Sequence, residues 1–328
     1  MPQIYIIIAT TIITNHNKSS CFLYIDVLFD VDHTLWPEVD KLYGHTNDVV
    51  CLTLSGDSKY LATACKARNA DTASIFIWET TNHTRVSSLA CHESTVICLR
   101  FSPDDRLLVS AGKDRSLCLH QRLEDEGRMN GYECVMILKG AHKRIIWDSC
   151  WSGDSAMLLT GSRDGYCKMW KVLSTSTCDS FELMCIFQFS PFDGASVTSL
   201  DMLREPMEDG SWRCCMGSEG GEITVYKVLL LEENTKNAGV GSKVEESKAF
   251  PMHTDSPATS LLQRFSSSLA TVEESYKANA LQSHGSSVQR IRWKQPPIKQ
   301  GMDLISRDAS LFVSSGEDFS VRIFSVPW

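Results

Sequence analysis

The stretch AHKRIIWDSCWSGDSAMLLTGSRDGYCKMW, residues 141–170, decides the fold of this chain. Two largely apolar runs in it, IIWDSCW and AMLLTGS, flank the turn sequence SGDS. Apolar runs on either side of a short turn that contains Gly and Asp are typical of a β-hairpin. A third run, YCKMW, follows a second turn, RDG. The stretch therefore predicts a small antiparallel sheet.

The same pattern occurs twice earlier in the chain. One copy, GHTNDVVCLTLSGDSKYLAT, begins at Gly44, and another, CHESTVICLRFSPDDRLLVS, begins at Cys91. In each of the three copies a His precedes a Ser or Thr by 18 positions, which gives the pairs His45 and Thr63, His92 and Ser110, and His142 and Thr160. A repeat of this regularity indicates one structural unit that is used several times.

The pattern extends beyond the hydroxyl residue. Two copies carry an Asp four residues later and a large side chain six residues beyond that, namely Asp114 and His120, and Asp164 and Trp170. The first copy reaches the same final position, Trp78, after five additional residues. A fifth copy contains His284, Ser314 and Asp318. A degraded fourth copy, near residues 197–226, lacks both the His and the Asp, which predicts a weaker blade.

Five copies of one strand-rich unit predict an all-β fold of the β-propeller class. A single unit cannot bury both faces of its sheet, so neighbouring units must stack around an axis. We expect residues 1–31 to be an atypical N-terminal segment and residues 32–229 to hold blades one to four. Residues 230–280 are rich in Ser, Glu, Lys and Asn and predict a mobile low-complexity insertion, and residues 281–328 predict the final blade.

The composition is that of an ordinary globular protein in a reducing compartment. The net charge of −8 gives no general attraction for polyanions, so RNA could bind only through a local basic patch. The 13 cysteines are scattered without a C-x-x-C pair, which is typical of buried free thiols and gives no zinc spacing. The apolar run from Ile4 to Ile13 is too short for a transmembrane helix, and no basic residues of a signal peptide precede it. We therefore expect no metal, no cofactor and no membrane contact.

His142, Thr160 and Asp164 are the residue types of a nucleophilic catalytic triad. The same set recurs at the same spacing in other copies, whereas an enzyme needs a single site. In a repeated blade these residues have a structural task, because they can satisfy one another's polar groups where the sheet is buried. The chain also lacks the G-x-x-x-x-G-K-[ST], G-x-S-x-G and H-E-x-x-H motifs. We therefore expect that the chain is not an enzyme.

Loops beside the repeated His and Asp are the expected contact surface, because a rigid sheet displays them. The candidate binding residues in these loops are Lys113, Arg115, Lys143, Arg144, Trp147 and Arg163. Two interpretations stay open for them: a solvated blade edge, or a patch that binds phosphate or acidic groups. A second basic stretch comprises Arg290, Arg292 and Lys294, which alternate with apolar residues. This alternation fits either an RNA-binding strand or a half-buried strand with one solvated face.

Several longer motifs resemble one family of repeat proteins. They are LWPEV-x-KLYGH at residues 35–45, LATACKARNADTASIFIWET at 61–80, HKRIIWDSCWS at 142–152, TGSRDGYCKMW at 160–170 and SSGEDFSVRIFSV at 314–326. Together they are similar to the WD40-repeat family of Elongator complex subunit 2, over about nine-tenths of the chain. The resemblance implies a WD40-type propeller with about five recognisable blades, the C-terminal part of a seven-bladed ring. It leaves open whether five blades close the ring.

The resemblance also implies a function. Members of this family are non-catalytic scaffolds that bridge the large scaffold subunit and the radical-SAM/acetyltransferase subunit of Elongator, which modifies wobble uridines in tRNA. Contact with tRNA and a location in the cytoplasm and nucleus are implied as well. The family has two seven-bladed propellers, and the first propeller and the start of the second have no counterpart in this chain. The alternative is a generic WD40 adaptor or RNA-binding propeller outside Elongator.

Overall fold

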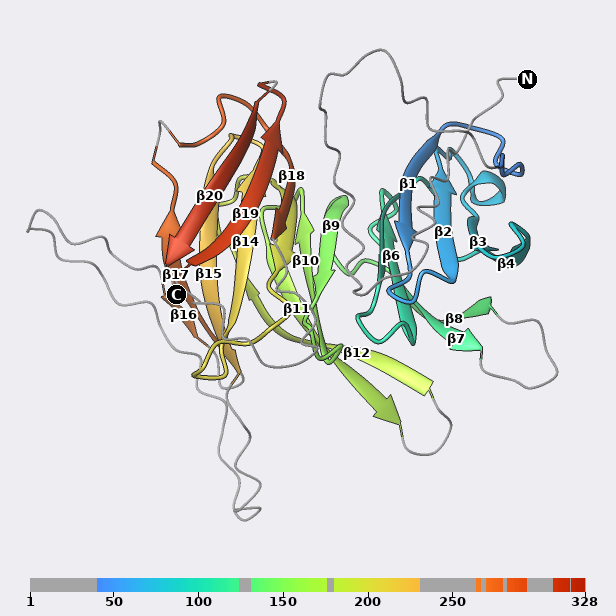
Figure 1. Ribbon diagram of the computed structural model, residues 1–328, viewed down its shortest axis with the longest axis horizontal. Coiled ribbons are helices and arrows are strands. Elements are labelled where there is room, and N and C mark those ends of the chain that lie inside the picture. Colours follow the sequence, from blue (N-terminus) through green and yellow to red (C-terminus); the bar gives the residue numbers. More distant parts are fainter. Residues whose placement is uncertain are drawn as a thin grey trace, which may run out of the picture.

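The computed structural model describes residues 40–123, 131–175, 180–230, 264–266, 270–279, 282–293, 309–318 and 320–327. Within these residues every regular element is a β-strand except one 3-10 turn, η1 (Ala70–Thr72). The strands form five antiparallel sheets that follow one another around an axis (Figure 1). The prediction of an all-β propeller with five blades is therefore confirmed. No helix in the described part of the chain is long and apolar enough to cross a membrane.

Each blade is one sheet built from consecutive strands. Blade one consists of β1 (Val49–Leu54), β2 (Tyr60–Cys65), β3 (Ile75–Glu79) and β4 (Arg85–Leu89). Blade two consists of β5 (Val96–Phe101), β6 (Leu107–Gly112), β7 (Leu117–Leu123) and β8 (Gly131–Leu138). Blade three consists of β9 (Ile146–Trp151), β10 (Met157–Ser162), β11 (Cys167–Thr175) and β12 (Ser180–Phe189).

The last two blades are less regular. Blade four consists of β13 (Val197–Met202), β14 (Trp212–Ser218), β15 (Ile223–Leu230), β17 (Ala270–Lys277) and β16 (Arg264–Ser266), in that spatial order. Blade five consists of β18 (Val288–Trp293), β19 (Ala309–Gly316) and β20 (Val321–Pro327). Strands β16 and β17 lie inside residues 230–280, so the predicted insertion does not extend to residue 280. The segments 231–263 and 1–31 lie outside the described residues, and the mobility of the insertion stays a prediction.

A repeated hydrogen-bond pattern forms the tight turn between the first two strands of a blade. In blade three the Ser152 hydroxyl donates to Asp154 Oδ1 at 2.5 Å and accepts the Met157 backbone N–H at 2.9 Å. Ser155 then adopts a left-handed φ of 60°, which closes the turn. The Ser-x-Asp turns of blades one and two have the same hydroxyl-to-carboxylate bond, at 2.7 and 2.5 Å.

Neighbouring blades contact each other through their innermost strands, in the order β1, β5, β9, β13 and β18. Apolar side chains from two adjacent sheets interleave at each junction. Between blades three and four, Leu159 and Met169 from one sheet share a buried cluster with Leu200 from the other. Since both faces of an inner blade are covered in this way, its core belongs to the junctions with its neighbours.

The two end blades each leave one apolar face uncovered. Val313 and Ile323 pair across β19 and β20 as Leu159 and Met169 pair across β10 and β11. Met169 is fully buried by blade four, whereas Ile323 is 73% exposed. On the first blade Leu52 is 55% exposed. In the described part of the chain, β18 and β1 do not pack along each other as the other neighbouring innermost strands do, so the five blades leave these two faces without a partner.

Gly161 tests the packing between blades three and four. A Cβ atom at this position would lie 2.7 Å from Leu200 Cδ2 and 2.8 Å from Val197 Cγ1. We expect Gly161→Ala to lower the free energy of unfolding by about 1–3 kcal/mol, because the junction must open to admit the methyl group. Urea denaturation followed by tryptophan fluorescence measures the change.

Gly220→Ala is the matched control, since the nearest atom to its added Cβ is 3.6 Å away. A loss of stability for Gly161→Ala no larger than that of this control would contradict the close approach of the two blades.

Candidate interaction surface

The predicted His, hydroxyl and Asp residues meet in blade three. His142 Nε2 lies 2.8 Å from Thr160 Oγ1, and His142 Nδ1 lies 3.1 Å from Asp164 Oδ2. The Asp164 carboxylate also accepts the backbone N–H of Lys143 at 2.9 Å. The indole N–H of Trp170 donates to Thr160 Oγ1 at 2.9 Å. The four side chains thus join the loop before β9 to strands β10 and β11 and to the loop between these two strands. We call such a hydrogen-bonded set of His, hydroxyl and Asp side chains, with the Trp that donates to the hydroxyl, the relay of a blade.

The His–hydroxyl–Asp set recurs in blades two and five, and blade one has part of it. In blade two, His92 lies 2.8 Å from both Ser110 Oγ and Asp114 Oδ2. The distances in blade five are 2.7 Å from His284 to Ser314 Oγ and 2.8 Å to Asp318 Oδ1. Blade one has the His45–Thr63 contact at 2.8 Å and the Trp78–Thr63 contact at 2.9 Å, but Ala67 stands where the Asp would be. All thirteen predicted relay residues therefore lie in these four networks.

Burial excludes these hydroxyls as nucleophiles for an external substrate. Thr160 and Ser110 are 0% exposed, and the imidazole beside each of them is 2% exposed. A nucleophile must reach its substrate, whereas a buried hydroxyl between two polar partners satisfies hydrogen bonds that water cannot. The arrangement therefore stabilises each blade and fixes the loops around it.

The pKa of the repeated imidazole differs between blades one and two. Burial, with a smaller contribution from the nearby Arg85 guanidinium, lowers the pKa of His45 to about 4. Burial also disfavours the charged form of His92, but the hydrogen bonds and charge interactions with Asp114 and Cys91 together outweigh it and raise the pKa of His92 to about 9. The repeated imidazole thus has a lowered pKa in blade one, where Ala67 stands in place of the Asp, and a raised pKa in blade two.

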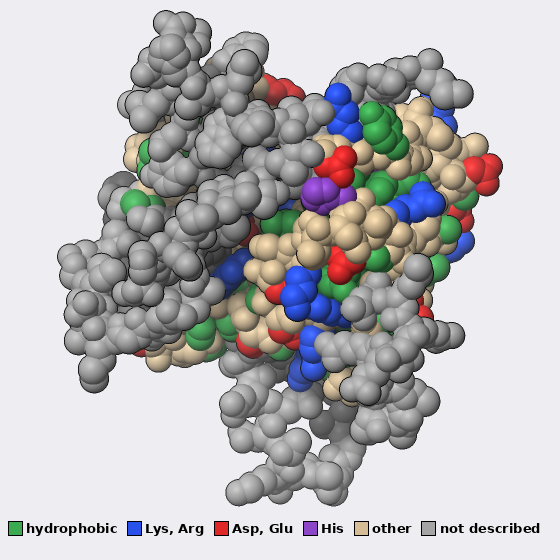
Figure 2. Space-filling model, turned by 45° about the vertical axis from the view of Figure 1, so that its right-hand side comes forward, with side chains coloured by type: hydrophobic (Ala, Val, Ile, Leu, Met, Phe, Trp, Pro, Cys, Tyr) green, Lys and Arg blue, Asp and Glu red, His purple; other side chains and the backbone are tan. Residues whose placement is uncertain are grey.

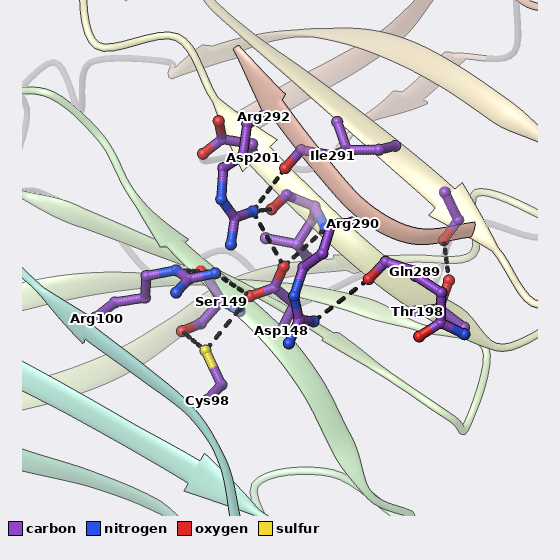
Figure 3. Close-up of polar contacts among 12 residues, drawn as sticks. Cys98, Arg100, Asp148, Ser149, Thr198, Asp201, Gln289, Arg290, Ile291 and Arg292 are labelled. Atoms are coloured by element: carbon purple, nitrogen blue, oxygen red, sulfur yellow. Dashed lines mark hydrogen bonds and ion pairs between the residues drawn. The ribbon is translucent and has the colours of Figure 1, made fainter. Parts of the chain in front are cut away.

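A second polar network lies where the innermost strands meet (Figure 3). The buried Asp148 carboxylate on β9 accepts from Arg100 Nη2 of β5 at 2.8 Å and lies 3.4 Å from Arg292 Nη1 of β18. It also accepts the backbone N–H of Leu200 on β13 at 3.3 Å. One carboxylate of blade three therefore contacts groups from three other blades. Breaking a buried pair of this kind costs about 3–5 kcal/mol, because a charge is left uncompensated.

Asp201 is a second buried carboxyl group beside this network. It lies on β13, and its Oδ2 accepts the backbone N–H of Trp293 on β18 at 2.7 Å. Burial raises the pKa of Asp201 to about 7, although that hydrogen bond and the Arg100 charge act in the opposite direction. The bond joins the innermost strands of blades four and five.

The five basic residues of the predicted contact surface all lie exposed in loops at one end of blades two and three. Lys113 and Arg115 are in the β6–β7 loop, and Arg163 is in the β10–β11 loop. Lys143 and Arg144 are in the β8–β9 loop. In the same loop, Lys139 Nζ lies 2.7 Å from Glu93 Oε1 of the β4–β5 loop. None of the five forms an ion pair with another described residue. Their charges are therefore available to a partner.

Trp147, the sixth residue of this prediction, differs from the others. Its side chain is half-buried on β9, and its indole N–H is buried without a hydrogen-bond partner among the described residues. The structure thus places Trp147 beside the basic loops but within the ring, not on the exposed loop surface.

Charge on this loop surface changes sign around the ring. In every blade, the first residue after the second strand donates its backbone N–H to a carbonyl in the loop before the first strand. The five residues at this position are Lys66, Lys113, Arg163, Glu219 and Glu317. All five side chains are exposed. Blades one to three therefore present basic groups where blades four and five present acidic groups. On the side of the molecule that Figure 2 shows, Lys and Arg side chains are interspersed with Asp and Glu side chains.

The second basic stretch has a structural role in part. Ile291 is fully buried and Arg290 is exposed, as the alternation predicted. Arg292 points toward Asp148 and donates to the Leu200 carbonyl at 3.3 Å. Lys294 lies outside the described residues. Arg292 thus belongs to the network between innermost strands, and the half-buried strand is the interpretation that its contacts favour.

Asp164 tests whether the relay holds the blade together. We expect Asp164→Ala to lower the free energy of unfolding by about 1–3 kcal/mol, because it leaves His142 and the Lys143 N–H without their acceptor. Thermal and urea denaturation measure this change. Asp71→Ala, at an exposed position in η1, is the control and should stay within about 0.5 kcal/mol of the wild type. An Asp164→Ala protein as stable as the control would show that the relay has no stabilising role.

Comparison with known proteins supports the fold at the level of the repeat. Residues 36–79, 83–121 and 132–171 match the model of the WD domain, G-beta repeat. Each segment contains one His–hydroxyl pair and all or most of the three inner strands of one of the first three blades, and the second and third segments begin at the outermost strand of the blade before.

The curated relatives share one name. The chain is 29% identical to Elongator complex protein 2 of Dictyostelium discoideum over 297 residues, which is 89% of this chain and 28% of the relative. It is 32% identical to the protein of that name in Danio rerio over 68% of the chain, and 34% identical to the one in Arabidopsis thaliana over 62%. The chain spans less than a third of the length of these relatives. The chain is a WD40-repeat β-propeller, and most of the chain's own length resembles part of Elongator complex protein 2.

Proposed function

We propose that the chain is a non-catalytic scaffold of an Elongator assembly and that its basic loop surface binds the other core subunits. We define this surface by the exposed residues Lys113, Arg115, Lys143, Arg144 and Arg163. The observation that supports the proposal is that these charges lie together on loops held by the His–hydroxyl–Asp relays, with no ion pair to described residues.

The relays explain why such a surface suits a scaffold. Asp114 and Asp164 fix the backbone of Glu93 and Lys143 by direct hydrogen bonds of 2.9 Å. Loops ordered before binding lose little conformational entropy when a partner arrives. An acidic partner surface would complement the basic loops of blades two and three, while Glu219 and Glu317 would repel it from blades four and five. The charge distribution thus favours one orientation of the partner.

Charge reversal on the surface tests the assembly role. We expect Arg144→Glu combined with Arg163→Glu to lower recovery of the large scaffold subunit and the radical-SAM/acetyltransferase subunit about tenfold, which corresponds to about 1.4 kcal/mol. Quantitative pull-down from a cell lysate, with the partner subunits identified by mass spectrometry, measures the effect.

Lys59→Glu combined with Arg106→Glu is the matched control. It makes the same change in net charge at exposed residues in the first turns of blades one and two, at the opposite end of the sheets. Equal recovery with both variants would exclude the basic loops as the binding surface. A wild-type chain that retains no Elongator subunit would contradict the assembly role itself.

Direct contact with tRNA is a second candidate function for the same surface. Five exposed basic side chains that lack ion pairs with described residues could neutralise phosphates and release the counterions bound to them. The net charge of −8 confines such binding to this local surface. In this function the chain would hold tRNA near the modifying subunit in the cytoplasm and nucleus.

Salt dependence separates phosphate contact from other binding. If Arg144 and Arg163 each contact a phosphate, the charge-reversed double variant should bind tRNA more weakly. The slope of log affinity against log salt concentration should become shallower by about 1.5. Fluorescence anisotropy with labelled tRNA at several salt concentrations measures both. An unchanged slope, with the Lys59 and Arg106 variant for comparison, would rule out phosphate contact at these residues.

A further inference from the structure

Two cysteines and a histidine that also contacts the relay hydroxyl meet in blade two. The Sγ atoms of Cys91 and Cys134 and a ring nitrogen of His120 all lie within 4.8 Å of one another. Cys91 Sγ is 3.9 Å from His120 Nε2, the ring nitrogen that also contacts the Ser110 hydroxyl. Cys91 precedes β5, while His120 on β7 and Cys134 on β8 are cross-strand partners. Ligands of one zinc ion are about 3.5 Å apart, so these donor atoms are close to the separation that a shared metal ion requires.

The hydrogen bonds of His120 leave one of its nitrogens available. His120 stands where blades one and three have Trp78 and Trp170, whose indole N–H groups donate to the relay hydroxyl at 2.9 Å. His120 Nε2 lies 2.8 Å from the Ser110 hydroxyl and takes the place of that donor. A neutral imidazole that carries its proton on Nε2 has a lone pair on Nδ1.

That second nitrogen has no hydrogen-bond partner among the described residues. His120 is fully buried, and Nδ1 forms no hydrogen bond with any described residue. A buried acceptor without a partner is unfavourable, and in native structures it often marks a missing water or ion. The Ser110 hydroxyl on the opposite nitrogen also gives His120 the outer contact that orients most metal-binding imidazoles.

A second group of possible ligands shares Cys91 but is less suitable. Cys91, His92 and Cys118 also lie within 4.8 Å of one another. Both nitrogens of His92 are engaged, one by Ser110 and one by Asp114, each at 2.8 Å. Metal binding there would break the blade relay, whereas binding at His120 leaves it intact.

We propose that Cys91, His120 and Cys134 form a binding site for one thiophilic d10 metal ion, Zn²⁺ or Cu⁺. Two thiolates and one imidazole are ligands that both ions accept. On binding, each thiol releases its proton to solvent, and the two thiolate charges neutralise a buried Zn²⁺. Cys91 is 9% exposed and Cys134 is partly exposed, so an ion can enter from the outer edge of the blade and keep a water as a further ligand.

Metal titration of the reduced full chain tests the site. We expect native mass spectrometry to find one Zn²⁺ or one Cu⁺ bound tightly per chain when each ion is added separately, and we expect bound metal to raise the melting temperature. Cys134→Ser should lower the affinity by about 100-fold or more, because it removes a ligand. Cys185→Ser is the matched control, since it removes an exposed thiol on β12 and should bind as the wild type does.

A further variant keeps the structural relay while it removes the metal ligand. His120→Trp restores the indole that blades one and three use, so it should retain a folded blade and lose the ion. Co²⁺ added as a spectroscopic probe should give thiolate-to-metal charge-transfer absorption in the wild type and in Cys185→Ser, but not in Cys134→Ser. A wild-type chain that binds neither Zn²⁺ nor Cu⁺ would overturn the proposal. A Cys134→Ser chain that binds the metal as tightly as the wild type would also overturn it.

Discussion

A small sheet that is apolar on both faces is stable in water only when other sheets cover it. This constraint governs every blade of the chain. Met169 and Leu159 are buried because blade four lies over them, and Leu200 is buried because blade three lies over it. Local strand formation and long-range packing are therefore inseparable here. The tight Ser-x-Asp turns bring the strands of one blade together, but the free energy of burial is gained only between blades.

Polar groups add specificity to this apolar packing at two places. The His–hydroxyl–Asp relays act within a blade and set the loops at one end of the sheets. The Asp148 network acts between blades, at the ring of innermost strands, where it contacts Arg100, Leu200 and Arg292. Charge that varies on the exposed loops can then change the partner that is bound without disturbing either network. This separation is how one fold supports many interaction surfaces.

The sequence predicts the relays well because their members keep a constant spacing within one repeat. His142, Thr160 and Asp164 can be aligned with other copies by eye. The Asp148 network could not be predicted in the same way, since Arg292 is 144 residues from Asp148 and their contact depends on which blades are neighbours. The sequence does not predict the cluster of Cys91, His120 and Cys134 for a related reason, because their spacings of 29 and 14 residues match no local metal motif. Most of strand β17 lies inside the segment predicted as an insertion, because its polar sequence continues the composition of the residues before it.

Blade one is attached differently from the rest. In its first turn, the backbone N–H groups of Gly56 and Asp57 donate to the Asp105 carboxylate of blade two, at 2.6 and 2.7 Å. The backbone N–H of Ala67 donates to Thr95 Oγ1 at 3.0 Å. The groups that contact the central Asp148 carboxylate, in the part of the chain that the structure describes, come from the other four blades. Local unfolding can therefore begin at blade one without separating the buried charges. An opening confined to blade one would leave the charge network of the other four blades intact, which is the kind of local unit that amide exchange detects.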